Sequence, residues 1–252
     1  MGPVELSVSD LERTLDYWQG VVGLRVLARD NGRASLGADT ELVRFVEEPG
    51  AQSARGYAGL FHVALLLPSQ RDLARWLAHA ARERIGLEGL SDHAVSEAIY
   101  LCDPDEHGIE IYADRPRTQW EGRVMELMTT VPLDVDSLLG ELDDPRTEPF
   151  DGLPDGTVVG HTHLCVADVE ATVRFYRDVL GFELMAQLGP MAAFLAAGGY
   201  HHHVGANTWQ SEGAPYAPAD RARLVGATIH GAADDQEIVD PSGIPLTFTT
   251  SR

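Results

Sequence analysis

Cysteine is scarce in this chain, and runs of apolar residues are short. Only Cys102 and Cys165 occur among 252 residues, which argues against a disulfide framework and favours a reducing compartment. No apolar run approaches the roughly 20 residues that a membrane-spanning helix requires. The first residues also lack the basic segment and apolar stretch that mark a signal peptide. We therefore expect a cytoplasmic protein without a membrane anchor.

Basic residues are also few. The sequence has 19 Lys and Arg against 39 Asp and Glu, which gives a formal net charge of -20. Such a charge repels phosphate backbones and anionic lipid surfaces, and so argues against nucleic acid and membranes as partners. The apolar fraction of 44% is large enough to form a packed core. The expected partner is a small molecule, and the sequence leaves open whether the chain forms a homo-oligomer.

The chain repeats a pattern of one strand followed by one helix. Residues 4–12 match residues 162–170 at a constant offset. In each copy an apolar strand leads to an aspartate, Asp10 or Asp168, of the kind that caps a helix N-terminus. An amphipathic helix follows and stops at a glycine. The pattern predicts helices over residues 11–22 and 169–180, each followed by short strands.

Two further units share parts of this pattern. One begins at residues 60–67 and continues with a predicted helix over residues 71–84 and late strands at 97–101 and 109–112. The other begins at residues 223–229 and is too short to hold a helix before its last strands. The predicted fold class is therefore α+β, with four βαβββ modules of which the fourth is shortened.

The repeated signature and two Asp-Pro turns, at Asp103 and Asp240, resemble the vicinal oxygen chelate superfamily. That superfamily contains the glyoxalases, the bleomycin-resistance proteins and the extradiol dioxygenases. Residues 91–100, 108–112 and 198–209 are similar, more narrowly, to the four-module, catechol 2,3-dioxygenase-like proteins of the group. The resemblance implies that two modules close into a cup of strands around one divalent metal ion.

The order of the modules predicts how they pair. We expect two cup-shaped half-barrels, one formed by the first pair of modules at residues 1–117 and one by the second pair at residues 158–252. Residues 118–157 are rich in Pro, Gly and Asp, which is typical of a surface linker.

The resemblance also implies the metal ligands. In ring-cleaving members these are two His and one Glu, which leave positions on Fe(II) open for substrate and dioxygen. The corresponding positions hold His62, Glu110 and His161, whereas the first module has Pro3 at the place of a ligand. If modules pair in chain order, neither half has a complete triad. We therefore expect weak metal binding that a Pro3→His substitution strengthens.

Other interpretations of these residues are open. A single histidine such as His62 on an apolar strand is often a core residue with satisfied hydrogen bonds. Glu110 could face solvent on an edge strand. A further alternative is a metal site formed by His161, His203 and His230 without a carboxylate.

Three consecutive histidines, at residues 201–203, lie on a predicted strand. Alternation along a strand places His201 and His203 in the cup and His202 on the opposite face. The resemblance implies that a histidine on this strand assists proton transfer, a task that suits neutral imidazole near pH 7, so we predict His201 and His203 as catalytic residues. A polar network lining an unused cavity is the alternative. The other expected pocket residues are His163, Asn207, Trp209, Tyr216 and His230.

Two functions fit these observations. The first is a metal-dependent, extradiol ring-cleaving oxidoreductase of the catechol 2,3-dioxygenase type, which acts on an aromatic small molecule with Fe(II) or Mn(II). The second is a metal-free pocket protein that binds or converts a hydrophobic small molecule, in a resistance or natural-product role. His62, Glu110 and residues 199–209 favour the first function. The positions at which the modules lack a ligand favour the second, and these are Pro3, Gly226 and Thr247.

Overall fold

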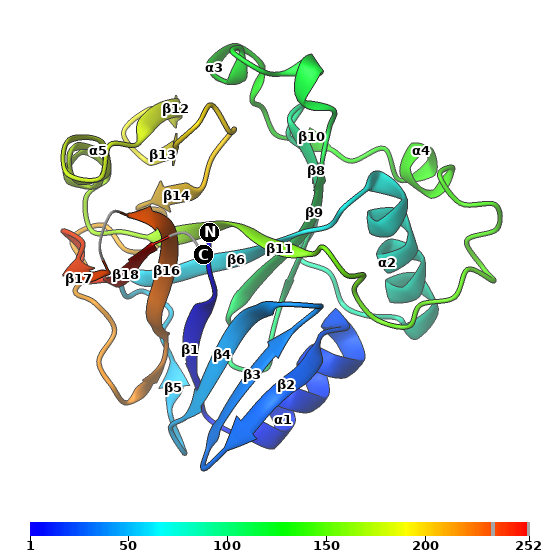
Figure 1. The fold of residues 1–252 in the computed structure, drawn as a ribbon, viewed down its shortest axis with the longest axis horizontal. Coiled ribbons are helices and arrows are strands. Elements are labelled where there is room, and N and C mark those ends of the chain that lie inside the picture. Colours follow the sequence, from blue (N-terminus) through cyan, green and yellow to red (C-terminus); the bar gives the residue numbers. More distant parts are fainter. Residues whose placement is uncertain (233–234, 251–252) are drawn as a thin grey trace.

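Two curved sheets form the body of the molecule (Figure 1), which a computed structural model describes for residues 1–232 and 235–250. The first sheet has seven strands. In spatial order they are β17 (Gln236–Val239), β18 (Pro245–Thr250), β16 (Leu224–Ala232), β1 (Val4–Val8), β4 (Glu41–Glu47), β3 (Arg33–Gly37) and β2 (Arg25–Asp30). A separate short pair joins β15 (Arg221–Ala222) to β5 (Gln52–Ser53).

The second sheet has nine strands and carries the site described below. In spatial order they are β10 (Val131–Pro132), β7 (Gly89–Asp92), β8 (Ser96–Cys102), β9 (Gly108–Asp114), β6 (Gly59–Leu66), β11 (Val158–Cys165), β14 (Val204–Asn207), β13 (Ala192–Ala196) and β12 (Glu183–Leu188). Strands β6 and β11 run side by side through the middle of the molecule (Figure 1). The predicted α+β class, with modules paired into cup-shaped half-barrels, is confirmed.

The pairing of the modules differs from the prediction. Strand β1 of the first module pairs with β16 of the fourth, and β6 of the second module pairs with β11 of the third. Neither sheet is confined to one of the predicted halves, 1–117 and 158–252, so pairing in chain order is wrong. The first strand of every module lies at the edge of its own set of strands. Either partner would satisfy the hydrogen bonds of that edge, and the repeat pattern does not distinguish between them.

The helices lie on the outer sides of the sheets (Figure 1). They are α1 (Leu11–Tyr17), which continues as the π-helical η1 (Trp18–Val22), α2 (Gln70–Glu83) and α5 (Val169–Asp178). The side chains of Asp10, Ser69 and Asp168 cap them by accepting backbone N–H groups in the first turn. All three predicted helices are present, with ends within two residues of the prediction. Among the described residues of the fourth module there is no helix, and none of the described helices is long and apolar enough to cross a membrane.

The segment between the second and third modules is partly structured. It contains η2 (Arg117–Gln119), α3 (Val124–Leu127), β10 and α4 (Val135–Leu139). Helix α4 packs on α2 through the buried Leu138. Strand β10 extends the nine-stranded sheet by pairing with β7. The segment is therefore part of the folded body around the second module.

A buried aspartate occupies the same place in two equivalent turns, one in the second module and one in the fourth. In the second module, Asp103 accepts the indole N–H of Trp18 from the first module and lies 2.9 Å from Nδ1 of His107. In the fourth module, Asp240 accepts two backbone N–H groups through Oδ1, while its buried Oδ2 has no partner among the described residues. Burial raises the pKa of Asp240 to about 6. The first turn therefore stabilises an ionised aspartate, and the second turn favours a protonated one.

We predict that Asp240→Asn stabilises the protein at pH 8. The folded-state pKa of Asp240 lies above its ordinary value of 3.8, so its contribution to stability is fully present below about pH 4 and is lost as the pH rises through about 6. The loss corresponds to at most about 3 kcal/mol. The asparagine amide keeps an oxygen acceptor and carries no charge. Urea unfolding should therefore give a higher midpoint for the variant at pH 8 and equal midpoints at pH 4.

The matched control for this experiment is Asp103→Asn. Burial opposes ionisation of Asp103, yet the adjacent His107 holds its pKa below the ordinary value. This substitution should therefore destabilise the protein at pH 8. An Asp240→Asn variant that is no more stable than the parent at pH 8 would contradict the assignment of a buried charge.

Candidate metal centre

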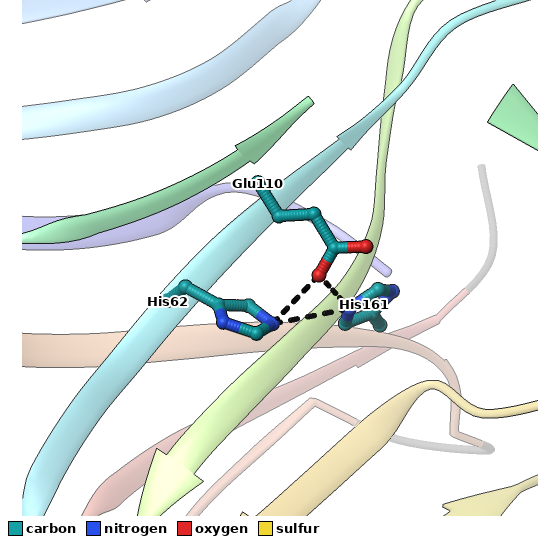
Figure 2. A group of neighbouring side chains, drawn as sticks. All are labelled: His62, Glu110 and His161. Atoms are coloured by element: carbon teal, nitrogen blue, oxygen red, sulfur yellow. Dashed lines mark hydrogen bonds and ion pairs between the residues drawn. The ribbon is translucent and has the colours of Figure 1, made fainter. Parts of the chain in front are cut away.

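Three neighbouring strands bring His62, Glu110 and His161 together. Strand β6 carries His62 and lies between β9, which carries Glu110, and β11, which carries His161. Both Glu110 and His161 are in register with Ala64 of β6, two residues beyond His62 on the same face. Because the Ala64 side chain is small, the longer side chains of Glu110 and His161 can extend over it toward each other. Figure 2 shows the three side chains converging from the three strands.

The polar atoms of these side chains form a compact triangle. Oε2 of Glu110 lies 2.8 Å from Nε2 of His62 and 3.0 Å from Nε2 of His161, and the two nitrogens are 3.4 Å apart. All three residues are at least 94% buried. Among the described residues this is the one group of three or more His, Cys, Asp or Glu side chains gathered closely enough to hold a metal ion.

The protonation states suit a metal. Burial opposes ionisation of Glu110, but the adjacent His161 and His62 hold its pKa well below the ordinary value. Burial lowers the pKa of His161 to about 4, against the opposing effect of Glu110. A carboxylate and a neutral imidazole are the forms that bind metal ions. Two imidazoles and one carboxylate form the facial donor set typical of non-haem Fe(II) sites, so the residues fit a divalent metal.

The observed pairing of the modules supplies the metal ligand that was expected to be missing. His161 of the third module reaches the site of the second module, whereas pairing in chain order would have placed Pro3 there. Pro3 instead lies beside β16 in the seven-stranded sheet, where its carbonyl oxygen accepts the N–H of Thr228. The expectation of an incomplete ligand set is therefore wrong, because it rested on pairing the second module with the first.

A cavity of about 730 Å³ extends from these three residues. Tyr100 lines it beside Glu110, because the two residues are in register on β8 and β9. The Tyr100 hydroxyl lies 2.8 Å from Nε2 of His93, whose Nδ1 lies 2.8 Å from the carbonyl oxygen of Thr129. Burial and the nearby Glu110 charge raise the pKa of Tyr100 well above its ordinary value. Tyr100 is therefore a neutral phenol within reach of a ligand in the cavity.

Tyr100 and His93 were absent from the predicted site residues. Both lie within the 91–100 stretch that carries the resemblance, so the signal was present in the sequence. The register of β8 against β9 was the missing information, since it places Tyr100 opposite the carboxylate.

The predicted arrangement of the three consecutive histidines is wrong. Residues 201–203 are not a strand, because β14 begins at Val204. His202 lines the cavity, with its ring centroid 4.0 Å from that of His161. Neither His201 nor His203 lines it. The preceding Gly198 and Gly199 both have positive φ, which turns the chain and breaks the strand alternation on which the prediction relied.

Three of the predicted pocket residues lie at or directly behind the cavity wall. His163 and Trp209 line the cavity, and the buried Asn207 lies behind them. The Nδ2 amide of Asn207 is 3.0 Å from Nε2 of His163. Gly205 makes room for this ring, because a Cβ atom there would lie 2.8 Å from it.

Tyr216 and His230 do not line the cavity. The Tyr216 hydroxyl donates to the carbonyl oxygen of Leu224. His230 lies on β16 of the other sheet, with its Nδ1 2.7 Å from Oγ1 of Thr249. The alternative metal site formed by His161, His203 and His230 is therefore not assembled.

Comparisons with known proteins agree with this fold. The family model described as the Glyoxalase/Bleomycin resistance protein/Dioxygenase superfamily matches residues 1–111 and 158–243. The crystal structure of glyoxalase I from Zea mays superposes with a TM-score of 0.61 at 15% identity, covering 99% of this chain and 92% of that chain. At that identity the superposition supports the fold alone.

Two curated relatives have a higher sequence identity to this chain. The chain is 41% identical over 238 residues to the catechol-2,3-dioxygenase of Bacillus subtilis (strain 168), an alignment that covers 91% of this chain and 81% of that protein. It is 31% identical over 120 residues to the glyoxalase domain-containing protein 4 of Mus musculus, covering 44% of this chain and 40% of that protein. The family match and the first of these relatives together place the chain in the glyoxalase, bleomycin-resistance and dioxygenase superfamily.

Proposed function

We propose that this protein is an extradiol, ring-cleaving dioxygenase that acts on a catechol-type aromatic molecule with Fe(II) or Mn(II). The buried triangle of His62, Glu110 and His161 at the wall of the large cavity carries the proposal. The 41% identity to a catechol-2,3-dioxygenase supports it. A divalent metal held by these residues would leave coordination positions open for two neighbouring hydroxyl groups and dioxygen.

The cavity wall suits a planar ring. Phe61 and Trp209 meet edge to face with ring centroids 5.3 Å apart, and Phe61 also lies 5.0 Å from the ring of His163. These flat apolar surfaces favour stacking or edge contacts with an aromatic ligand. At the polar end, Nδ1 of His93 donates to the carbonyl oxygen of Thr129, so its Nε2 accepts the Tyr100 hydroxyl. The Tyr100 oxygen is thereby left to accept a hydrogen bond from a ligand hydroxyl beside Glu110.

The metal-free alternative loses its main argument. It rested on the missing ligand at Pro3, and the third module supplies His161 in that place. Metal titration separates the two functions directly.

We predict one tight site for Mn(II) or Fe(II) per chain. His161→Ala and Glu110→Gln should each weaken metal binding by more than about 100-fold. Changing a residue that only hydrogen-bonds to a metal ligand already lowers metal affinity by about 10- to 100-fold. Anaerobic calorimetric titration of the metal-free protein measures the affinity, and circular dichroism checks the fold. Pro3→His is the control and should leave affinity unchanged. Tighter binding by that variant, or no stoichiometric binding by the parent, would refute the assignment.

We predict that the Fe(II)-loaded protein converts catechol or an alkylcatechol into a yellow ring-cleaved semialdehyde, with consumption of one dioxygen per product. Tyr100→Phe should lower kcat by about 100-fold, the typical contribution of a group positioned for proton transfer, and should leave metal affinity unchanged. Absorbance and oxygen-electrode measurements give the rates. Full metal occupancy without cleavage of any catechol would exclude the ring-cleaving function while leaving the metal site intact.

A further inference from the structure

A line of polar side chains leads from the cavity wall toward the protein surface. Nδ1 of His202 lies 2.8 Å from Nδ1 of His201, and Nε2 of His201 lies 2.9 Å from Oδ1 of Asp114. His201 is completely buried, whereas the side chain of Asp114 is 25% exposed. None of the three is needed to explain the metal centre, yet together they connect one cavity residue to a carboxylate near solvent.

The direction of these hydrogen bonds follows from Asp114. A carboxylate only accepts hydrogen bonds, so Nε2 of His201 must donate to it. In neutral His201 the other nitrogen, Nδ1, then carries no hydrogen and accepts. Nδ1 of His202 must therefore be the donor in the bond between the two rings. The remaining nitrogen of neutral His202, Nε2, is left with a free lone pair.

The charge states support this order. His202 is 5% exposed, and such burial disfavours a cationic ring. His201 is completely buried, and the order above applies to its neutral ring. The carboxylate of Asp114 already receives a second hydrogen bond, from the Tyr200 hydroxyl at 3.1 Å.

The surrounding structure holds this line in place. Asp114 follows Glu110 and Tyr112 at alternate positions of β9, so all three side chains lie on one face of the sheet. The Tyr112 hydroxyl lies 2.9 Å from that of Tyr200. The ring of Trp120 meets His201 edge to face, at 5.4 Å between centroids. Packing and hydrogen bonds therefore restrain both ends of the His201 ring.

We propose that Asp114 and His201 are positioning residues that fix the tautomer of His202, so that its Nε2 accepts a hydrogen bond from a hydroxyl group of the ligand. Nδ1 of His202 is turned to His201 and the residue lines the cavity, so Nε2 is the nitrogen that remains for a ligand. The ligand is a molecule that presents a hydroxyl beside the triad. That it is a catechol rests on the proposed function, whereas the tautomer does not.

The tautomer can be measured without activity. In the metal-free protein labelled with ¹⁵N-histidine, long-range ¹H–¹⁵N spectra should show a protonated Nδ1 and an unprotonated Nε2 for His202. Asp114→Asn should abolish this preference, because the amide can donate a hydrogen bond to His201. That would reverse the direction of the hydrogen bonds between the two histidines. Asp114→Glu should restore it. Glu5→Gln is the matched control, since the Glu5 carboxylate is 27% exposed and lies in the other sheet; it should change nothing.

The kinetic result separates positioning from folding. Asp114→Asn should lower kcat for catechol cleavage by about 10- to 100-fold, as for other outer-shell groups, with Mn(II) affinity unchanged. His201→Phe, which interrupts the line while keeping a ring, should act similarly and serves if Asp114→Asn fails to fold. A parent protein with hydrogen on Nε2 of His202 would overturn the proposal. So would an Asp114→Asn variant with unchanged tautomer and kcat. If catechols are not cleaved at all, the ring-cleaving function fails, and the spectra alone decide the positioning role.

Discussion

The antiparallel pairing of β6 with β11 is the contact on which the site depends. It joins the second module to the third and brings His62 and His161, 99 residues apart in sequence, to within 3.4 Å. Neither module alone has a full set of ligands. The metal centre therefore belongs to the seam between two modules, and forming it requires the two to fold against each other. The first and fourth modules pair by the same kind of contact, between β1 and β16, but bring no comparable group of ligands together among the described residues.

Burying the Glu110 carboxylate at this interface between modules costs free energy unless a positive group lies beside it. Transfer of an unpaired carboxylate into the protein interior costs several kcal/mol, and Glu110 is 2% exposed. The nearby His62 and His161 offset part of that cost through hydrogen bonds. A divalent cation would offset more, because it adds a charge at the point where all three donor atoms converge. Metal binding should therefore also stabilise the fold, by the general linkage between a ligand and the state that binds it.

The modules could be predicted from the sequence because they follow local rules, such as the aspartates Asp10 and Asp168 that mark helix starts. The candidate ligands His62 and His161 followed from the family resemblance, which implies a ligand on the first strand of a module. The pairing of modules was not predictable, since two edge strands with equivalent hydrogen-bonding groups do not show which partner each will take. The place of His202 was missed for a different reason. Two glycines in the left-handed region turn the chain, and alternation holds only within a regular strand.

Two glycines restrict the register of the strands in the second sheet, because neighbouring groups come too close to them for a side chain to fit. Gly108 lies opposite His62 on β9, and a Cβ atom there would come within 2.0 Å of the carbonyl oxygen of Phe61. Gly160, just before His161, faces the Tyr112 hydroxyl, where a Cβ atom would lie at 1.8 Å. A slip of β9 by one residue would turn Glu110 to the opposite face, together with Tyr112 and Asp114. The close approach at these glycines therefore fixes both the ligand and the carboxylate that orients the histidine line, because one strand carries both.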